Sequence, residues 1–172
     1  NTLESIVWMA EGGNSRQVVE MTTDLSDFFR TVLSGGKDFI TIAEEECHIR
    51  SYLKIQKIRY EDILDYDICI EPQLETQVIL KMILQPIVEN ALYHGIKNKR
   101  GGGRISIRGY ASGDCVLFEV EDNGTGMDEK TLDELREKLE GKKNRPDSRK
   151  NSFGMYNVAQ RIRMYYGTKS NI

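Results

Sequence analysis

The chain has 172 residues, enough for one good-sized domain or for a domain with a helical appendage. Apolar residues make up 39% and charged residues 30%, which suits a folded core under a soluble surface. The net charge of −3 gives no basic field of the kind that binds nucleic acid or an anionic membrane. No apolar stretch approaches the roughly 18–20 residues of a membrane span. We therefore expect membrane attachment only through segments outside this chain.

The cysteines favour a reducing compartment. Cys47, Cys69 and Cys115 are scattered, odd in number and without metal-ligand spacing. We expect buried, reduced thiols and a cytoplasmic location. Because the chain begins at Asn1 rather than at a methionine, we also expect it to be part of a longer protein.

Residues 1–61 show helical patterns. Residues 2–34 carry apolar side chains at helical spacing, with a break at Gly12-Gly13. The sequence Thr41-Ile42-Ala43-Glu44 is a capping box, and it predicts a helix to about residue 60. We predict an antiparallel helical hairpin that forms a segment separate from residues 62–172.

The pattern changes after residue 61. Residues 64–70 alternate between polar and apolar side chains, which predicts a half-buried strand. An apolar run predicts a long helix from about residue 75 to residue 94, with a kink or a restart at Pro86 and a stop at Gly95. The later predictions are a glycine loop at 101–103, strands at 105–110 and 115–120, a helix at 129–140 with a capping box from Thr131 to Glu134, a mobile basic loop at 141–152 and a helix at 154–166. This order predicts an α+β fold, with one mixed sheet and helices on one face.

Polar residues interrupt the apolar helix in the sequence LQPIVENALYHGI. Asn90 and His94 lie on one helical face, Lys97 would follow one turn later, and Glu89 borders that face. One interpretation is a helix edge that simply reaches solvent. The other is a row of groups facing metal and phosphate, because an amide oxygen is a suitable ligand for Mg²⁺.

A second polar cluster is EVEDNGTGMD, residues 119–128. Asn-Gly after an alternating strand favours a hairpin, but a helical pattern follows in place of a returning strand. The alternative is a strand, a glycine loop and a helix, with Gly124 and Gly126 where the backbone approaches something closely. Asp122 at the strand end could then accept a hydrogen bond from an exocyclic amine such as that of adenine.

A third cluster is FGMYN, residues 153–157, where a helix begins after a basic loop. N–H groups at a helix N-terminus together with nearby lysines and arginines could bind phosphates, or the loop could simply be solvated. Asn90, Asp122 and Gly154 are evenly spaced along the chain, which makes three independent coincidences improbable.

Together the clusters resemble the motifs of a known superfamily. VENALYHG resembles the N box, EDNGTGM the G1 box and NSFGMYN the G2 box of the GHKL ATPases, and EEECHIRSYLKIQKIRYED is similar to sensor histidine kinases of the LytS/YesM type. The resemblance implies a Bergerat-type α/β sandwich without its final strands, and ATP and Mg²⁺ as cofactors. There is no GxxxxGK[ST] motif.

The resemblance also implies residue roles. Asn90 would coordinate Mg²⁺, and Glu89 would occupy the position of a general base. The remaining predicted ATP-binding residues are His94, Lys97, Asp122, Gly124, Gly126, Met127, Gly154, Met155 and Asn157. Residues 128–152 would form a lid over the nucleotide.

The implied activity is phosphoryl transfer from ATP to a histidine. Asn1-Thr2-Leu3 resembles the end of a phosphoacceptor segment, so the acceptor histidine is expected just upstream of this chain. His48 is expected to serve in helix packing. The implied partners are a second copy, bound through the N-terminal helices, and a response regulator. The alternatives are an ATPase or serine kinase of the same superfamily and a nucleotide-binding pseudokinase.

Overall fold

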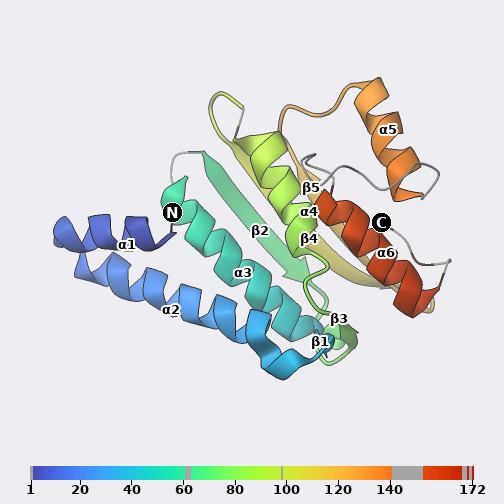
Figure 1. The fold of residues 1–172 in the computed structure, drawn as a ribbon, viewed down its shortest axis with the longest axis horizontal. Helices are drawn as coiled ribbons and strands as arrows, with labels where there is room; N and C mark the ends of the chain where they lie inside the picture. The colour runs from blue at the N-terminus through green and yellow to red at the C-terminus, as the bar shows by residue number, and fades with distance from the viewer. Residues whose placement is uncertain (1, 61–62, 98, 141–152, 168–169, 171) are drawn as a thin grey trace.

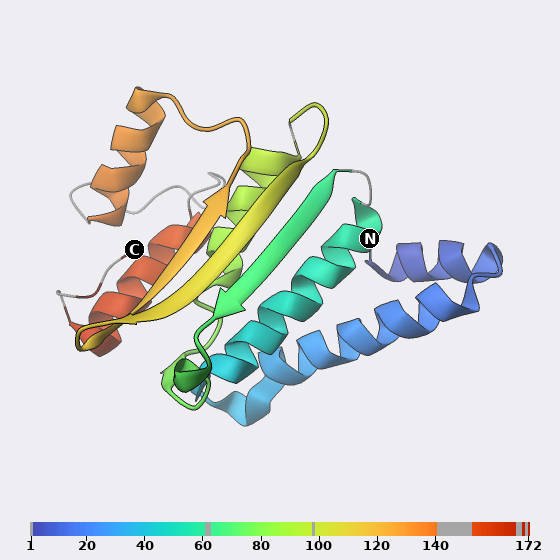
Figure 2. The ribbon, with the colours of Figure 1, turned by 180° about the vertical axis from the view of Figure 1, so that it is seen from behind.

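The computed structural model describes residues 2–60, 63–97, 99–140, 153–167, 170 and 172. They form helices and a mixed sheet, which confirms the predicted α+β class. Helices α3 (Ile42–Arg59), α4 (Gln85–Asn90) and α6 (Phe153–Tyr166) cover one face of the sheet, and the described helices leave its other face open (Figures 1 and 2). Within these residues, no helix combines the length and the apolar character that crossing a membrane requires.

The N-terminal helices form the predicted hairpin. Helix α1 (Thr2–Glu11) is followed by α2 (Ser15–Leu33), and Gly13 between them has a φ of 74°. A short 3₁₀ turn, η1 (Ser34–Gly36), reverses the chain so that α2 and α3 lie side by side (Figure 1). The capping box is confirmed, because the Thr41 hydroxyl accepts from the Glu44 N–H and the Glu44 carboxylate accepts from the Thr41 N–H at 2.7 Å.

The main sheet has three strands in the order β2-β4-β5. Its members are β2 (Leu64–Ile70), β4 (Gly103–Ser112) and β5 (Cys115–Asp122). Strands β2 and β4 are parallel, with α4 in the connection between them, and β4 and β5 form an antiparallel hairpin. Ile105 pairs with Asp122, so the end of β5 lies beside the start of β4.

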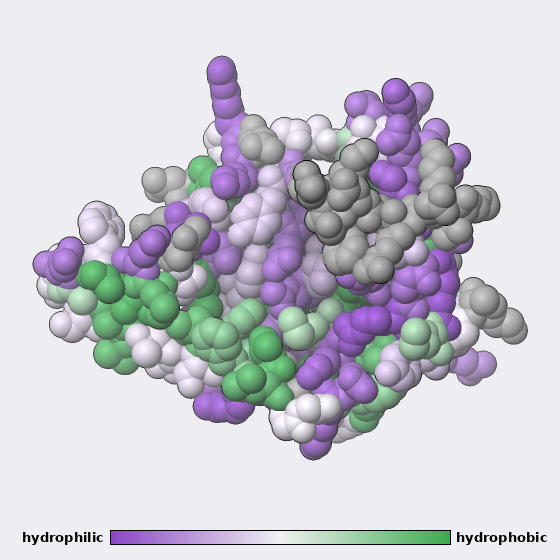
Figure 3. Space-filling model, in the orientation of Figure 1, coloured by the Kyte–Doolittle hydropathy of each residue, from purple (hydrophilic) through white to green (hydrophobic). Residues whose placement is uncertain are grey.

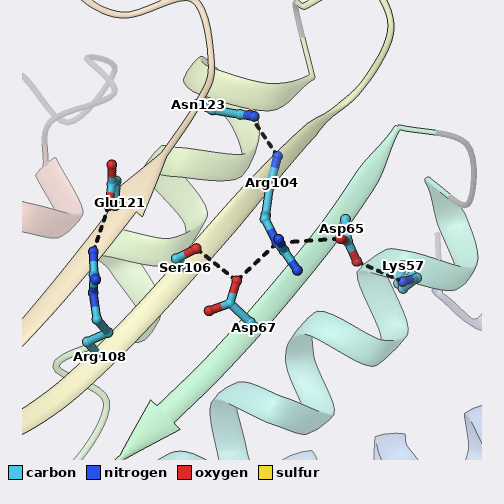
Figure 4. A network of polar contacts seen from close by, with 8 residues as sticks. All are labelled: Lys57, Asp65, Asp67, Arg104, Ser106, Arg108, Glu121 and Asn123. Carbon is cyan, nitrogen blue, oxygen red and sulfur yellow. Dashed lines mark hydrogen bonds and ion pairs between the residues drawn. The ribbon is translucent and has the colours of Figure 1, made fainter.

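Charged and hydroxyl side chains line the open face and pair across neighbouring strands (Figure 4). Arg104 Nε lies 3.0 Å from Asp67 Oδ1, and the Ser106 hydroxyl donates to the same oxygen at 2.8 Å. Arg108 of β4 pairs with Glu121 of β5 at 2.8 Å. Exposed pairs of this kind contribute at most about 1 kcal/mol each, so they keep the face polar rather than hold the sheet together.

The long helix predicted for residues 75–94 is wrong over its first half. A 3₁₀ turn, η2 (Pro72–Leu74), and a short strand, β3 (Val78–Leu80), precede the helix, and β3 pairs antiparallel with β1 (Phe39–Thr41). Helix α4 starts only at Gln85 and has Pro86 in its first turn, where the missing N–H of proline has no partner to lose. A short apolar run has no distinctive periodicity, so pairing with a distant strand decides its structure.

Two local predictions are also corrected. Gly103, predicted to lie in a loop, begins strand β4. Helix α5 (Glu129–Leu139) is capped by Asp128, whose carboxylate accepts from the Thr131 N–H at 2.7 Å, so the predicted capping box from Thr131 to Glu134 is wrong. Aspartate at the residue before the helix satisfies a first-turn N–H in the same way as threonine would.

The three cysteines are free, as predicted, but they are exposed rather than buried. Cys69 of β2 and Cys115 of β5 alternate with inward-facing apolar residues, so they point to the open face of the sheet. For these two cysteines the prediction failed because a residue in a strand with two different faces can occupy either face.

The hydrophobic core joins the sheet to its covering helices. Its buried residues include Leu53 of α3, Ile107 of β4, Leu92 after α4 and Val158 of α6. A smaller second cluster, made by Met9, Met21, Ile55 and their neighbours, joins α1, α2 and α3. Helix α3 contributes to both clusters. The division of the chain after residue 61 stays a prediction.

Helices α1 and α2 also carry apolar side chains that the core does not bury. Figure 3 shows hydrophobic side chains gathered along the edge that these helices form. The exposed members are Leu3, Val7, Trp8, Val19, Phe29 and Leu33. An apolar surface of this kind on a helical pair is typical of a protein–protein contact.

A buried carboxylate fixes the segment that leads into α4. Glu45 of α3 is fully buried and accepts hydrogen bonds from the N–H groups of Met82, Ile83 and Leu84, at 2.7, 2.9 and 2.9 Å. Burial raises the pKa of the Glu45 carboxyl, and the three N–H bonds oppose that shift. Met82 has a φ of 57°, a left-handed backbone that needs such support in a residue other than glycine.

We predict that Glu45→Ala destabilises the fold by about 3–5 kcal/mol, because three N–H groups in a buried or partly buried segment lose their acceptor. Chemical denaturation measures the effect. Glu46→Ala on the same helix is the matched control, since Glu46 forms an i,i+4 pair with the partly exposed Arg50 and should change stability by less than about 1 kcal/mol. Equal effects of the two substitutions would contradict the role of Glu45.

Candidate active site

One helix carries the first polar cluster. Glu89 and Asn90 are half-buried at the end of α4, while Val88, Ala91 and Leu92 are buried and anchor the helix to the core. The polar and apolar residues therefore lie on different sides, as the sequence predicted. The polar side is the one available to a ligand.

After Asn90 the helix widens into a π-helix, η3 (Ala91–Ile96). The Lys97 N–H accordingly bonds to the Leu92 carbonyl, five residues back, at 2.9 Å. Such bulges are rare and occur often at functional sites. Because a π-turn changes the direction of later side chains, the α-helical spacing used to place Lys97 does not apply. Its ammonium lies 5.6 Å from the centre of the Tyr93 ring and 5.9 Å from that of Tyr60.

The second cluster sits against the end of this helix. The alternation of β5 directs Asp122 toward the side of the sheet that the helices cover. The Gly124 N–H donates to Asp122 Oδ1 at 2.9 Å. Thr125 then holds the loop to η3, because its hydroxyl donates to the His94 carbonyl and its N–H to the Gly95 carbonyl, both at 3.2 Å. The chain therefore forms a strand, a loop and a helix here, and not the alternative hairpin.

Two glycines allow this close approach. A Cβ at Gly95 would collide with the Asp122 carboxylate, and a Cβ at Gly124 would collide with the backbone of Gly95. Gly95 was predicted to stop the helix, but η3 continues through it to Ile96, so that prediction is wrong. The reason for this glycine is contact with β5, which local sequence does not reveal. Gly126 has a φ of 71°, which favours glycine for conformational reasons.

The third cluster meets the start of the same helix. A Cβ at Gly154 would lie 3.1 Å from Pro86 Cβ, so the first turn of α6 packs closely on the first turn of α4. Met155 is buried and Asn157 is half-buried. The predicted loop 141–152, about half of the predicted lid, lies outside the described residues. The part of the lid that is described forms α5, which contacts α6.

All three clusters thus contact one helical wall. Gly154 lies at its start, Glu89 and Asn90 lie in its middle, and Asp122 lies at its end. Met127 follows the glycine loop and is exposed. Sequence reasoning missed the bonds of Thr125, although this residue stands inside the EDNGTGM motif. The individual roles of the predicted residues stay predictions.

Comparison with known proteins agrees with this arrangement. Residues 1–64 match the family described as histidine kinase, and residues 75–171 match the family of histidine kinase-, DNA gyrase B- and HSP90-like ATPases. The chain belongs to this ATPase family. The GHKL resemblance is thereby confirmed, and so is ATP as the nucleotide that the family handles.

Several curated relatives are sensor proteins. The chain is 32% identical over 97% of its length to sensor histidine kinase YesM of Bacillus subtilis, and 35% identical over 72% to sensor histidine kinase BtsS of Escherichia coli. It is 28% identical over 88% of its length to sensor protein LytS of Bacillus cereus. The chain spans 27%, 21% and 25% of these three relatives, respectively.

We predict that Gly95→Ala destabilises the protein by about 1–3 kcal/mol, because the added methyl group must displace Asp122 or the loop after it. Thermal unfolding measures the loss. Gly12→Ala is the control, since its Cβ would meet only ordinary contacts, at 3.4 and 3.6 Å, and should change stability by less than about 0.5 kcal/mol. A Gly95→Ala protein as stable as wild type would contradict the close approach.

Proposed function

We propose that this chain is the ATP-binding catalytic core of a two-component sensor histidine kinase. It would transfer the γ-phosphoryl group of ATP to a histidine outside this chain, for relay to an aspartate of a response regulator. The observation that carries the proposal is the meeting of all three polar clusters on one helix. The adjacent histidine kinase match at residues 1–64 favours a kinase over an ATPase or serine kinase.

Glu89 and Asn90 would act at the phosphates. The amide oxygen of Asn90 is a suitable oxygen ligand for Mg²⁺, which keeps several waters and shares its shell with phosphates. When bound, Mg²⁺ neutralises charge on the transferring group. As the imidazole nitrogen bonds to the γ-phosphorus and the bond to the ADP oxygen breaks, Glu89 would accept the proton that the imidazole loses.

The flanking clusters would hold the nucleotide. Asp122 would accept from the adenine amino group, with Gly124, Gly126 and Met127 shaping the loop around the base. His94 and Lys97 would lie near the phosphates. The α6 start, from Gly154 through Met155 to Asn157, would close over them. These roles combine positioning with charge stabilisation, which is most of what phosphoryl transfer requires.

The N-terminal helices α1 and α2 would provide the contact with a second copy. The exposed apolar side chains of α1 and α2 support a homodimer formed through these helices. A response regulator would be the second partner. We place the chain in the cytoplasm, with any membrane attachment made by segments outside it.

The decisive test is transfer from γ-labelled ATP with Mg²⁺ in the full-length kinase. We expect a label that is lost in acid and stable in base, as for phosphohistidine. Asn90→Ala should reduce Mg²⁺-dependent labelling by at least about 100-fold, because the bound metal loses a ligand. Gln73→Ala, which alters an exposed amide that bonds to Glu71, should label normally. ATP binding without any label would indicate a pseudokinase, and labelling by Asn90→Ala at the wild-type rate would overturn the metal assignment.

A second prediction concerns the base. Asp122→Asn should lower the preference for ATP over GTP by about tenfold or more, because the acceptor for the adenine amine is weakened. Competition between the two nucleotides measures the preference. Glu121→Gln is the neighbouring control, since Glu121 points to the open face and pairs with Arg108. An unchanged preference in Asp122→Asn would contradict the adenine assignment.

A further inference from the structure

A hydrogen-bonded chain of side chains joins helix α3 to Glu89. His48 Nε2 lies 2.7 Å from Gln85 Oε1, and Gln85 Nε2 donates to Glu89 Oε1 at 2.8 Å. Gln85 is one turn before Glu89 on α4, so its amide lies along the same helical side. The three polar side chains lie beside a core of apolar residues, and His48 is fully buried.

The chemistry of the three side chains fixes which atom donates and which accepts in each of these hydrogen bonds. An ionised carboxylate only accepts hydrogen bonds, so the amide of Gln85 must present its NH₂ group to Glu89. Its carbonyl oxygen is then left for His48, which must carry its proton on Nε2. His48 Nδ1 has no hydrogen-bond partner among the residues that the structure describes, so Nε2 makes the one hydrogen bond found there for this ring. Every donor in the chain therefore points toward Glu89.

The His48 end of this hydrogen-bonded series is held rigidly. His48 is fully buried, and its ring stacks on Phe28 of α2 with 4.6 Å between ring centres. Glu45, one turn earlier on α3, holds the backbone just before Gln85 through its bond to the Leu84 N–H. Tyr52, one turn later on α3, is buried, and burial and then the Glu89 charge raise the pKa of its hydroxyl. Helix α3 thus connects to Glu89 through His48 and Gln85.

We propose that Gln85, oriented by His48, is a positioning residue that fixes the carboxylate of Glu89 for proton transfer. The inference rests on the proposed function, since it assigns a supporting residue to the proposed proton acceptor. It gives α3 a part in catalysis without contact with ATP. A glutamate carboxylate that is not held samples several side-chain conformations and becomes a less efficient proton acceptor, because proton transfer depends on close alignment.

The test compares labelling rate at saturating ATP with ATP affinity in the full-length kinase. Gln85→Met keeps the side-chain length and removes both hydrogen bonds. We expect the rate to fall by about tenfold, a part of the roughly 10²–10⁴-fold that a positioned proton acceptor supplies, while ATP affinity changes less than about twofold. Gln56→Met is the matched control, because Gln56 is a buried amide on α3 that takes no part in the hydrogen bonds from His48 to Glu89. The labelling rate of this variant should stay within about twofold of wild type.

A pair of His48 variants separates hydrogen bonding from packing. His48→Gln retains an N–H that can donate to Gln85 and should keep most of the rate, whereas His48→Leu should be slowed like Gln85→Met. If His48→Leu does not fold, the Gln85→Met result alone decides. Equal slowing by Gln85→Met and Gln56→Met would overturn the proposal, and so would a loss of ATP affinity in Gln85→Met at an unchanged rate.

A double-mutant cycle tests whether Gln85 acts through Glu89. Adding Gln85→Met to a Glu89→Ala protein should cause no further slowing, because there is no carboxylate left to position. Full additivity would overturn the inference. If wild type transfers no phosphoryl group, the proposed function fails. If wild type transfers the phosphoryl group and Glu89→Ala is slow but Gln85→Met is not, then only the role of Gln85 fails.

Discussion

The position of one short helix is the constraint on which the rest of the site depends. Helix α4 and its π-helical continuation meet α6 at one end and the loop after β5 at the other. Its local sequence alone does not make this helix stable, because α4 has only six residues. Its place is fixed from outside, by burial of Val88 and Leu92 and by the three N–H bonds that Glu45 accepts just before it.

Features that depend on neighbouring residues could be predicted from sequence. The capping box at Thr41, the alternating strand that ends at Ile70 and the final helix that ends at Tyr166 all carry their signal within a few positions. The cap of α5 was assigned to the wrong residue, although the correct signal, Asp128, stood nearby. The sequence contained both local patterns, the capping box from Thr131 and the single cap at Asp128, and the prediction chose the wrong one.

Features that depend on distant contacts could not be predicted. Strand β3 exists because β1 pairs with it, and the apolar run at Val78 reveals nothing of that partner. Gly95 has the appearance of a helix stop, yet its purpose is to admit the Asp122 carboxylate from another strand. The three polar clusters were recognised through their motifs, but the bonds of Thr125 and Gln85 that connect them to their surroundings needed coordinates.

The two hydrophobic clusters differ in size, so the parts of the protein that they hold should differ in internal motion. The larger one holds the sheet, α3, α4 and α6, whereas α1 contributes Met9 to a smaller cluster, whose other buried members in the described part of the chain are Met21 and Ile55. Free energies of local opening follow the amount of buried apolar contact, so amide protons of α1 should exchange with solvent well before those of the sheet. Helix α3 has buried residues in both clusters and so connects α1 and α2 to the sheet. Helix α1 is therefore held less firmly than the sheet and its covering helices, and α3 connects the two parts.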